Sequence, residues 1–294
     1  MIDMSSTGEL FRLANHKYKN MRTRSLLLRW PQSIALSMLF VLSHTTSASD
    51  DVGMVKGVWQ VSEAHTNSAA TSIGHYIWND PRLVGRIFSF DDAVIRNNTP
   101  EFDVCAVPTF HPINFDLGGT IQTSMGGYGY PPVQPTASDY RIAPGDGKSR
   151  SIFEVRCGTT PWHNELGVDP IRGVWIAKLG TDQIALRWFG ETVLTLHRVV
   201  EGAKPNPSFS CVKASSAAER TICSSYELSA FDQSVSTAYV QLLKQAKVTD
   251  HETAGVVADQ GAWLKLRNRC LTSRECLIKS MRNRLEVIVS KIQT

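Results

Sequence analysis

Short stretches in which apolar and polar residues alternate recur through residues 57–198. A period of two is typical of half-buried β-strands, because successive side chains of a strand point to opposite faces. The pattern predicts strands at 57–62, 85–90, 94–96, 151–157, 174–179, 183–188 and 192–198. The last three are separated by connections short enough for hairpins, so an antiparallel meander is expected. Many short strands without helices between them favour a small barrel or a sandwich, and the Gly- and Pro-rich region 108–135 is predicted to be a loop.

The pattern changes to a helical period near the C-terminus. Apolar side chains recur there in steps of three and four, which places them on one helical face: Leu228, Phe231, Val235, Tyr239, Leu242 and Ala246. After a turn near 248–253, a second amphipathic run carries Val256, Val257, Trp263, Leu264 and Cys270. The chain is therefore predicted to be an α+β protein, with an antiparallel β-barrel or sandwich followed by an α-helical hairpin module.

Two helix-start signals lie just before this hairpin. In each, a serine hydroxyl can accept a hydrogen bond from a free backbone N–H while a glutamate three residues on reaches back, which is a capping box. The pairs are Ser216 with Glu219 and Ser224 with Glu227. Two helices are therefore expected to begin within about ten residues of each other.

The N-terminal segment has the pattern of an export signal. Basic residues follow Met21, an apolar span covers 34–42, and small residues occupy 46–49, which together are typical of a secretory signal peptide. The span is shorter than the roughly 20 residues that cross a bilayer, so a cleaved signal at 21–48 is favoured over a retained membrane anchor. Residues 1–20 are then interpreted as an overcall of the start site.

The remaining chain divides into a β domain at 50–200, a linker at 201–207 that contains Gly and Pro, and a helical domain at 208–294. Residues 50–207 carry a net charge of −4 and residues 208–294 one of +4, so the exported chain is neutral. A neutral chain without a basic block does not predict binding to nucleic acid.

The six cysteines all lie beyond residue 100. An even number of cysteines without zinc-type spacing indicates disulfides and a periplasmic or secreted location. Cys105 and Cys157 are the only cysteines of the β half and are predicted to pair. For the other four, two arrangements stay open: a local Cys270–Cys276 bridge, which requires the helix to break at 272–273, or bridges across the hairpin from Cys211 and Cys223. Either would staple a module with a small core.

The C-terminal sequence resembles the LprI-type domain, a small, secreted, all-helical module named after a lysozyme inhibitor. The resemblance covers 208–294 and rests on residues that agree in order and approximate spacing: Phe209, Cys211, Glu219, Ile222, Cys223, Leu228, Asp232, Ala238, Tyr239, Gln260, Trp263, Leu264, Cys270, Cys276, Leu277 and Arg284. Two positions depart from the pattern, with Met281 where an aromatic is common and Arg269 where an acidic residue often stands. The resemblance implies a binding module without cofactors whose partner is lysozyme or another envelope protein.

The first and last predicted strands carry a second, shorter resemblance. Gly57-x-Trp59 and the final Arg198 are similar to the lipocalin-like pattern, in which an arginine from the last strand covers a tryptophan of the first. A guanidinium group can stack on an indole ring and close one end of a barrel.

No catalytic constellation stands out from the residues. Glycine-rich Gly145–Ser149 lacks the spacing of a phosphate loop, and no metal-type histidine pair or serine elbow is present in the sequence. His163, beside Trp162 and Glu165, is the one local cluster that could act as acid and base. On the helical seam, Trp263 is expected in the core and Gln260 is expected to bond to backbone.

These observations lead to three functional hypotheses. The first is an exported, non-catalytic binding protein of the lysozyme-inhibitor type that requires no cofactor. The alternatives are a barrel that carries a small apolar ligand, with the helices as a docking module, and a cell-envelope hydrolase that uses His163 and Glu165.

Overall fold

The computed structural model describes residues 53, 55–70, 74–127, 134–142, 151–167, 169–248 and 253–293. The predicted start-site segment, 1–20, and the predicted signal peptide, 21–48, lie outside these residues, as does the phosphate-loop-like stretch 145–149. All described residues belong to one compact unit, Thr46–Thr294.

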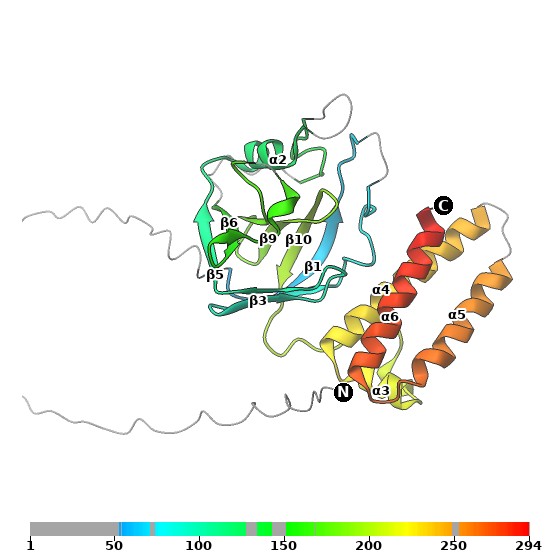
Figure 1. Ribbon diagram of the computed structural model, residues 1–294. Coiled ribbons are helices and arrows are strands. Elements are labelled where there is room, and N and C mark those ends of the chain that lie inside the picture. The colour runs from blue at the N-terminus through cyan, green and yellow to red at the C-terminus, as the bar shows by residue number, and fades with distance from the viewer. Residues whose placement is uncertain are drawn as a thin grey trace, which may run out of the picture. The chain divides into compact units, whose positions relative to one another are not determined.

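The strands form one antiparallel sheet that curls into a nearly closed barrel (Figure 1). The order across the sheet is β4-β3-β2-β1-β10-β9-β8-β6-β5, with β7 paired to β6. The bounds are β1 Gly57–His65, β2 Ile87–Phe90, β3 Val94–Asn97, β4 Val104–Ala106, β5 Pro108–Pro112, β6 Ile152–Cys157, β7 Thr160–Pro161, β8 Trp175–Lys178, β9 Gln183–Trp188 and β10 Thr192–Arg198. The predicted meander is confirmed as β8-β9-β10, joined by hairpins.

The two edges of the sheet meet at a single residue. β4 ends at Ala106 and β5 begins at Pro108, so Val107, with a φ of 50°, carries the chain from one edge to the other. A disulfide joins Cys105 in β4 to Cys157 in β6 and ties the edges together. The loop predicted at 108–135 is wrong at its start, because β5 pairs with β6 along its whole length; an edge strand tolerates its two prolines.

Apolar side chains are buried on both faces of the strands. Ile184, Leu186 and Leu196 point inward with the aromatic core. Trp175 and Val193 point outward under α2, Leu117–Met125, where the Trp175 indole N–H donates to Ser124 Oγ at 2.9 Å. The helix begins because Asp116 accepts from the backbone N–H of Gly119. This helix is a second correction to the predicted loop.

Arg198 stacks over Trp59 as the lipocalin-like pattern suggested. The guanidinium carbon lies 4.2 Å from the centre of the indole ring, and Trp59 is fully buried. Nη1 of Arg198 also donates to the carbonyl of Lys56 at 2.6 Å. The first and last strands of the barrel are therefore linked by a cation–π contact as well as by their ladder.

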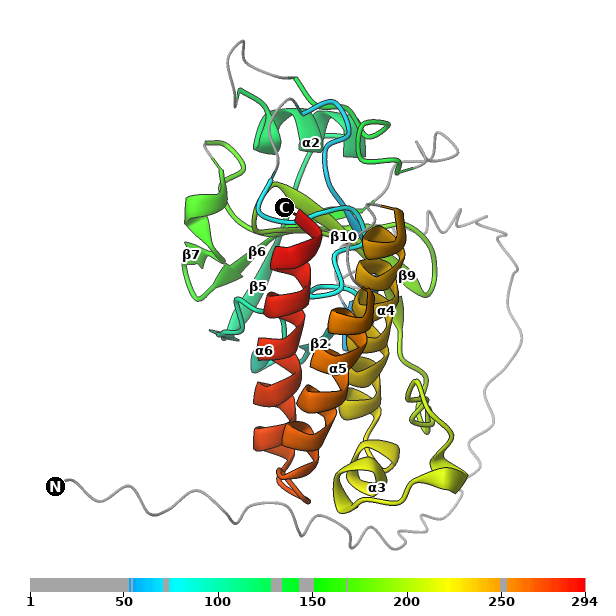
Figure 2. The ribbon, with the colours of Figure 1, turned by 90° about the vertical axis from the view of Figure 1, so that its right-hand side faces the viewer.

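The helical module follows the barrel (Figures 1 and 2). It begins with the 3-10 turn η2, Cys211–Lys213, and continues with the helices α3 Ala217–Cys223, α4 Tyr226–Val248, α5 Thr253–Asn268 and α6 Arg274–Gln293. The described part of the barrel half contains the 3-10 turn η1, Asn164–Leu166. The predicted second run, which carries Val256 to Cys270, corresponds to α5, and a further helix, α6, follows after the chain turns at Leu271, which has a φ of 51°. Most of the core comes from α3, α4 and α6. Met281, which stands where an aromatic is common in the LprI-type pattern, is fully buried in this core.

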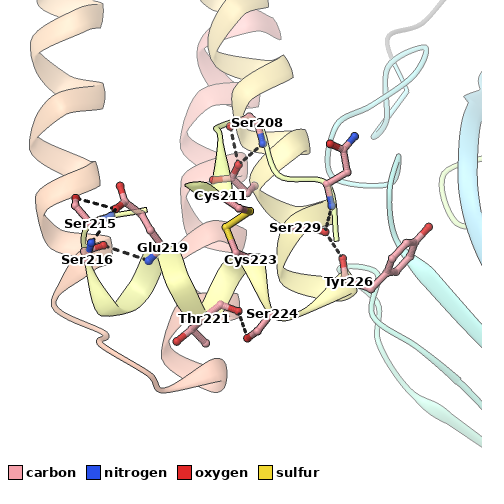
Figure 3. Close-up of a disulfide and its surroundings, with 12 residues drawn as sticks. Ser208, Cys211, Ser215, Ser216, Glu219, Thr221, Cys223, Ser224, Tyr226 and Ser229 are labelled. Atoms are coloured by element: carbon pink, nitrogen blue, oxygen red, sulfur yellow. Dashed lines mark hydrogen bonds between the residues drawn. A yellow bond between two sulfur atoms is a disulfide. The ribbon is translucent and has the colours of Figure 1, made fainter. Parts of the chain in front are cut away.

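One of the two capping boxes forms as predicted. Ser216 Oγ accepts from the N–H of Glu219, whose carboxylate accepts from the N–H of Ser216 (Figure 3). The second box is wrong by one residue: Ser225, not Ser224, accepts from the N–H of Leu228 and starts α4. Ser224 instead donates to the carbonyl of Thr221 at the end of α3.

Candidate functional site

Both disulfides of the helical module are local. Cys211 pairs with Cys223 across 12 residues, joining the segment before α3 to the end of that helix (Figure 3). Cys270 pairs with Cys276 across six residues and closes the turn between α5 and α6. Of the two arrangements left open by the sequence, the structure contains the local one, because the break at 271–273 brings the Cα atoms of the second pair to 5.5 Å.

Asp232 forms a buried ion pair with Arg267. Oδ1 lies 3.1 Å from Nη1 of Arg267, and both side chains are almost fully buried. The second carboxylate oxygen accepts from the backbone N–H and the hydroxyl of Ser208 at 2.8 and 2.6 Å. Asp232 therefore holds three segments together: the start of the module, α4 and α5.

Arg284, Gln260 and Trp263 form a second cluster between α5 and α6. Oε1 of Gln260 accepts from Nε and Nη2 of Arg284 at 2.9 and 2.8 Å, so the predicted bond from Gln260 to backbone is wrong. The Trp263 ring is half-buried against the core and lies 5.5 and 5.6 Å from the guanidinium carbons of Arg267 and Arg284. Its position between two arginines joins the two polar clusters.

Asp259 completes this cluster at its solvent edge. It accepts from Nη1 of Arg284 at 2.9 Å and from Nζ of Lys291 at 3.2 Å. The hydrogen bond from Arg284 is the main reason that the pKa of Asp259 lies below its usual value. Neither Asp259 nor Arg267 was identified from the sequence. The sequence did offer one signal for Arg267: Asp232 lies at a buried position of the helical pattern, and a buried carboxylate requires a cation as its partner.

Helix α5 is held to the module mainly by these polar contacts. Arg267 is its one buried residue among those described, and Val256 and Trp263 pack at the margin of the core. Val257 and Leu264, expected on the inner face of the run, are 51% and 36% exposed, which corrects that prediction. They lie seven residues apart and therefore share one outward face of the helix. Tyr239 on α4 is half-buried against the core.

The barrel interior is filled by its own side chains. Trp59, Trp188 and Phe88 are fully buried there. The cavity next to Trp59 and Phe153 measures about 10 Å³, which is about the least that a single water molecule needs. This packing speaks against an apolar ligand inside the barrel.

His163 lies between two carboxylates at one end of the barrel. Nδ1 is 3.3 Å from Glu165 Oε1 and Nε2 is 3.3 Å from Asp103 Oδ2, while the ring stacks on Trp162. Among the residues that the structure describes, no hydroxyl or thiol contacts either ring nitrogen. The arrangement orients an imidazole but supplies no nucleophile for it to activate.

Two further searches cover the described part of the chain only. It contains no group of three or more His, Cys, Asp or Glu side chains placed to hold a metal ion. None of its helices combines the length and the apolar character needed to cross a membrane.

The site thus defines a disulfide-stapled helical module with two charged clusters at its seam, attached to a packed β-barrel. Residues 211–287 of this module match the family model described as lysozyme inhibitor LprI. The match lies inside the predicted helical domain, 208–294, and includes all four of its cysteines. No curated protein and no solved structure matches the chain.

Proposed function

We propose that this chain is an exported, non-catalytic binding protein whose helical module recognises and inhibits a lysozyme in the cell envelope. The observation that supports this most is the family match at 211–287. Three disulfides suit an oxidising compartment. In this proposal residues 21–48 direct export, residues 50–200 and 208–294 are separate domains, and 201–207 is the linker between them.

The outward face of α5 is the proposed contact surface. Val257 and Leu264 are exposed on this face of the helix, and Leu271 is exposed on the turn after it. The Asp232–Arg267 and Gln260–Arg284 contacts fix the orientation of α5 from its inner side. An apolar face on a helix held in one position presents contact area at low entropic cost.

The opposite net charges of the two halves suggest that each contributes differently to binding. Lys265 and Arg269 flank the α5 face and are exposed, so this face alone would repel a strongly basic lysozyme. Residues 50–207 carry a net charge of −4. In this proposal the β domain steers a basic enzyme electrostatically, and the α5 face makes the apolar contact.

A lysis assay tests the proposal. The full exported chain, purified with its disulfides intact, is mixed with lysozyme at increasing molar ratios, and the initial rate of cell-wall lysis is recorded. We expect the rate to fall toward zero near stoichiometric ratios when the enzyme concentration exceeds the Kd. An unchanged rate at large molar excess would remove the inhibitor function. The same chain after full reduction serves as the control for the stapled module.

A further inference from the structure

A pocket of about 180 Å³ lies where α4 and α6 approach β2 and the segment after β3. Its walls include three guanidinium groups, two phenyl rings and one carboxylate: those of Arg82, Arg86, Arg282, Phe102, Phe231 and Glu286. It is separate from the charged clusters of α5.

Arg86 forms the floor of the pocket. Its side chain is 0% exposed, and its guanidinium carbon lies 3.4 Å above the Phe231 ring. Nη2 donates to the carbonyl of Ala230 at 3.3 Å and to Ser234 Oγ at 2.9 Å. Nε and Nη1 are buried and have no hydrogen-bond partner. A buried arginine thus keeps two donors unused.

Arg282 forms one wall and contacts the same ring. Its guanidinium carbon is 5.8 Å from the centre of Phe231 and 4.6 Å from that of Phe102. Nη2 donates to the carbonyl of Asn98 at 3.1 Å, while Nε is buried without a partner. Two cations therefore share one aromatic ring, with unused donors on both.

The acidic groups around the pocket are paired with other cations. Glu286, which lines the pocket, pairs with Arg82 of the same wall at 3.1 Å, and Asp80 pairs with Arg82 at 2.7 Å. Glu227 accepts from Asn98 Nδ2 and pairs with Arg274. Among the described residues, no carboxylate lies within ion-pairing distance of Arg86 or Arg282.

This arrangement is electrostatically unfavourable as it stands. Burial, and after it the nearby Arg282, lowers the pKa of Arg86 to about 9. Burial also lowers the pKa of Arg282. Glu227 acts in the opposite direction on both arginines. A buried charge is costly unless it is paired and hydrogen-bonded. An anion between the two guanidinium groups would satisfy the unused donors and offset their repulsion.

We propose that this pocket binds a small oxyanion, of the carboxylate or phosphate class, between Arg86 and Arg282. Guanidinium groups present planar pairs of N–H donors that match both anions. Arg282 is half-buried and held by one hydrogen bond to Asn98, so it is the side chain that turns to admit the anion to the covered Arg86. Phe102, 62% exposed at the rim, offers an apolar contact for any body attached to the anionic group.

Thermal unfolding and calorimetry of the full exported chain test this site, with inorganic phosphate and acetate as probes. Sodium chloride at equal ionic strength is the reference. We expect the unfolding midpoint to rise saturably with one or both probes, because a ligand that binds only the folded state stabilises it. A response to phosphate alone or to acetate alone supports the site and assigns its class. No saturable response to either probe overturns it.

Matched variants tie the response to the pocket. Arg282→Gln should weaken binding at least tenfold, and Lys279→Gln, an equal charge change at an exposed position on the same helix, should leave it unchanged. Arg86→Met should fold and lose the response, since an apolar side chain of similar length suits a buried site. If it does not fold, the α6 pair of variants carries the test. The proposal would be contradicted if Arg282→Gln bound the probe anion with the affinity of the wild type, or if Arg282→Gln and Lys279→Gln lost the same affinity. None of these outcomes depends on lysozyme binding.

Discussion

The carboxylate of Asp232 lies 3.1 Å from the guanidinium of Arg267, and both side chains are almost completely excluded from solvent. The pair links α4 to α5, a helix with no other buried residue among those described. Burial lowers the pKa of Arg267, while Asp232 acts in the opposite direction. The attachment of α5 therefore depends on a charged contact more than on apolar packing.

Removal of the acidic partner should be strongly destabilising. Asp232→Asn leaves Arg267 buried without a counter-charge, and we expect the free energy of unfolding to fall by about 3–5 kcal/mol. Urea unfolding monitored by circular dichroism measures the loss. Asp92→Asn is the control: that side chain is 77% exposed and its partner Lys56 is 47% exposed, so its loss should cost no more than about 1 kcal/mol. Equal losses in the two variants would refute the role given to the buried pair.

The disulfides should differ in how much they stabilise the fold. Loop-closure entropy predicts about 4 kcal/mol for Cys105–Cys157 and about 2 kcal/mol for Cys270–Cys276, because the bridges close separations of 52 and six residues. The double variants Cys105→Ser/Cys157→Ser and Cys270→Ser/Cys276→Ser, compared by urea unfolding, give the two values. A larger loss from the short bridge would contradict the order predicted from loop closure.

Barrel stability should depend on pH through His65. The ring is buried, and its Nε2 lies 2.8 Å from Thr195 Oγ1. Burial is the main reason that its pKa is lowered below 6.5. Below pH 6.5 the unfolded chain therefore takes up a proton that the folded chain does not, so stability present above pH 6.5 is lost as the pH falls through the folded pKa.

Thermal unfolding at pH 7.5 and 5.5 checks this. We expect the midpoint of the wild type to fall more than that of His65→Gln over this interval. His197→Gln, at an exposed strand position, should retain the wild-type dependence. An identical pH dependence in wild type and His65→Gln would rule out His65 as the cause.

Local patterns predicted most of the regular structure. The alternating pattern located β1, β6 and the β8-β9-β10 meander, whose connections are too short for any other arrangement. The burial of both faces of β6, β8, β9 and β10 was not predicted. The helical period located α4, and Ser216 with Glu219 located the start of α3. The box at Ser224 failed because Ser224 is the C-cap of α3 and its backbone N–H donates to the carbonyl of Arg220. Glu227 is instead engaged by Asn98 and Arg274.

What the sequence could not predict depends on tertiary partners. β5 forms in a Pro-containing stretch because β6 supplies its hydrogen bonds. Gln260 bonds to Arg284 rather than to backbone because α6 returns past α5. Arg267 and Arg86 are single arginines with no local pattern, and their significance is visible only once burial removes them from water.

The most direct test of the central claim is the affinity of residues 49–294 for lysozyme, measured by calorimetry with variants of the α5 face. Leu264→Asp places a charge on the proposed contact surface, while Val287→Asp changes an apolar side chain of α6 that is 45% exposed. We expect wild type and Val287→Asp to bind with equal affinity and Leu264→Asp to bind at least tenfold more weakly. Absence of binding by the folded wild type, or equal losses in both variants, would contradict the account.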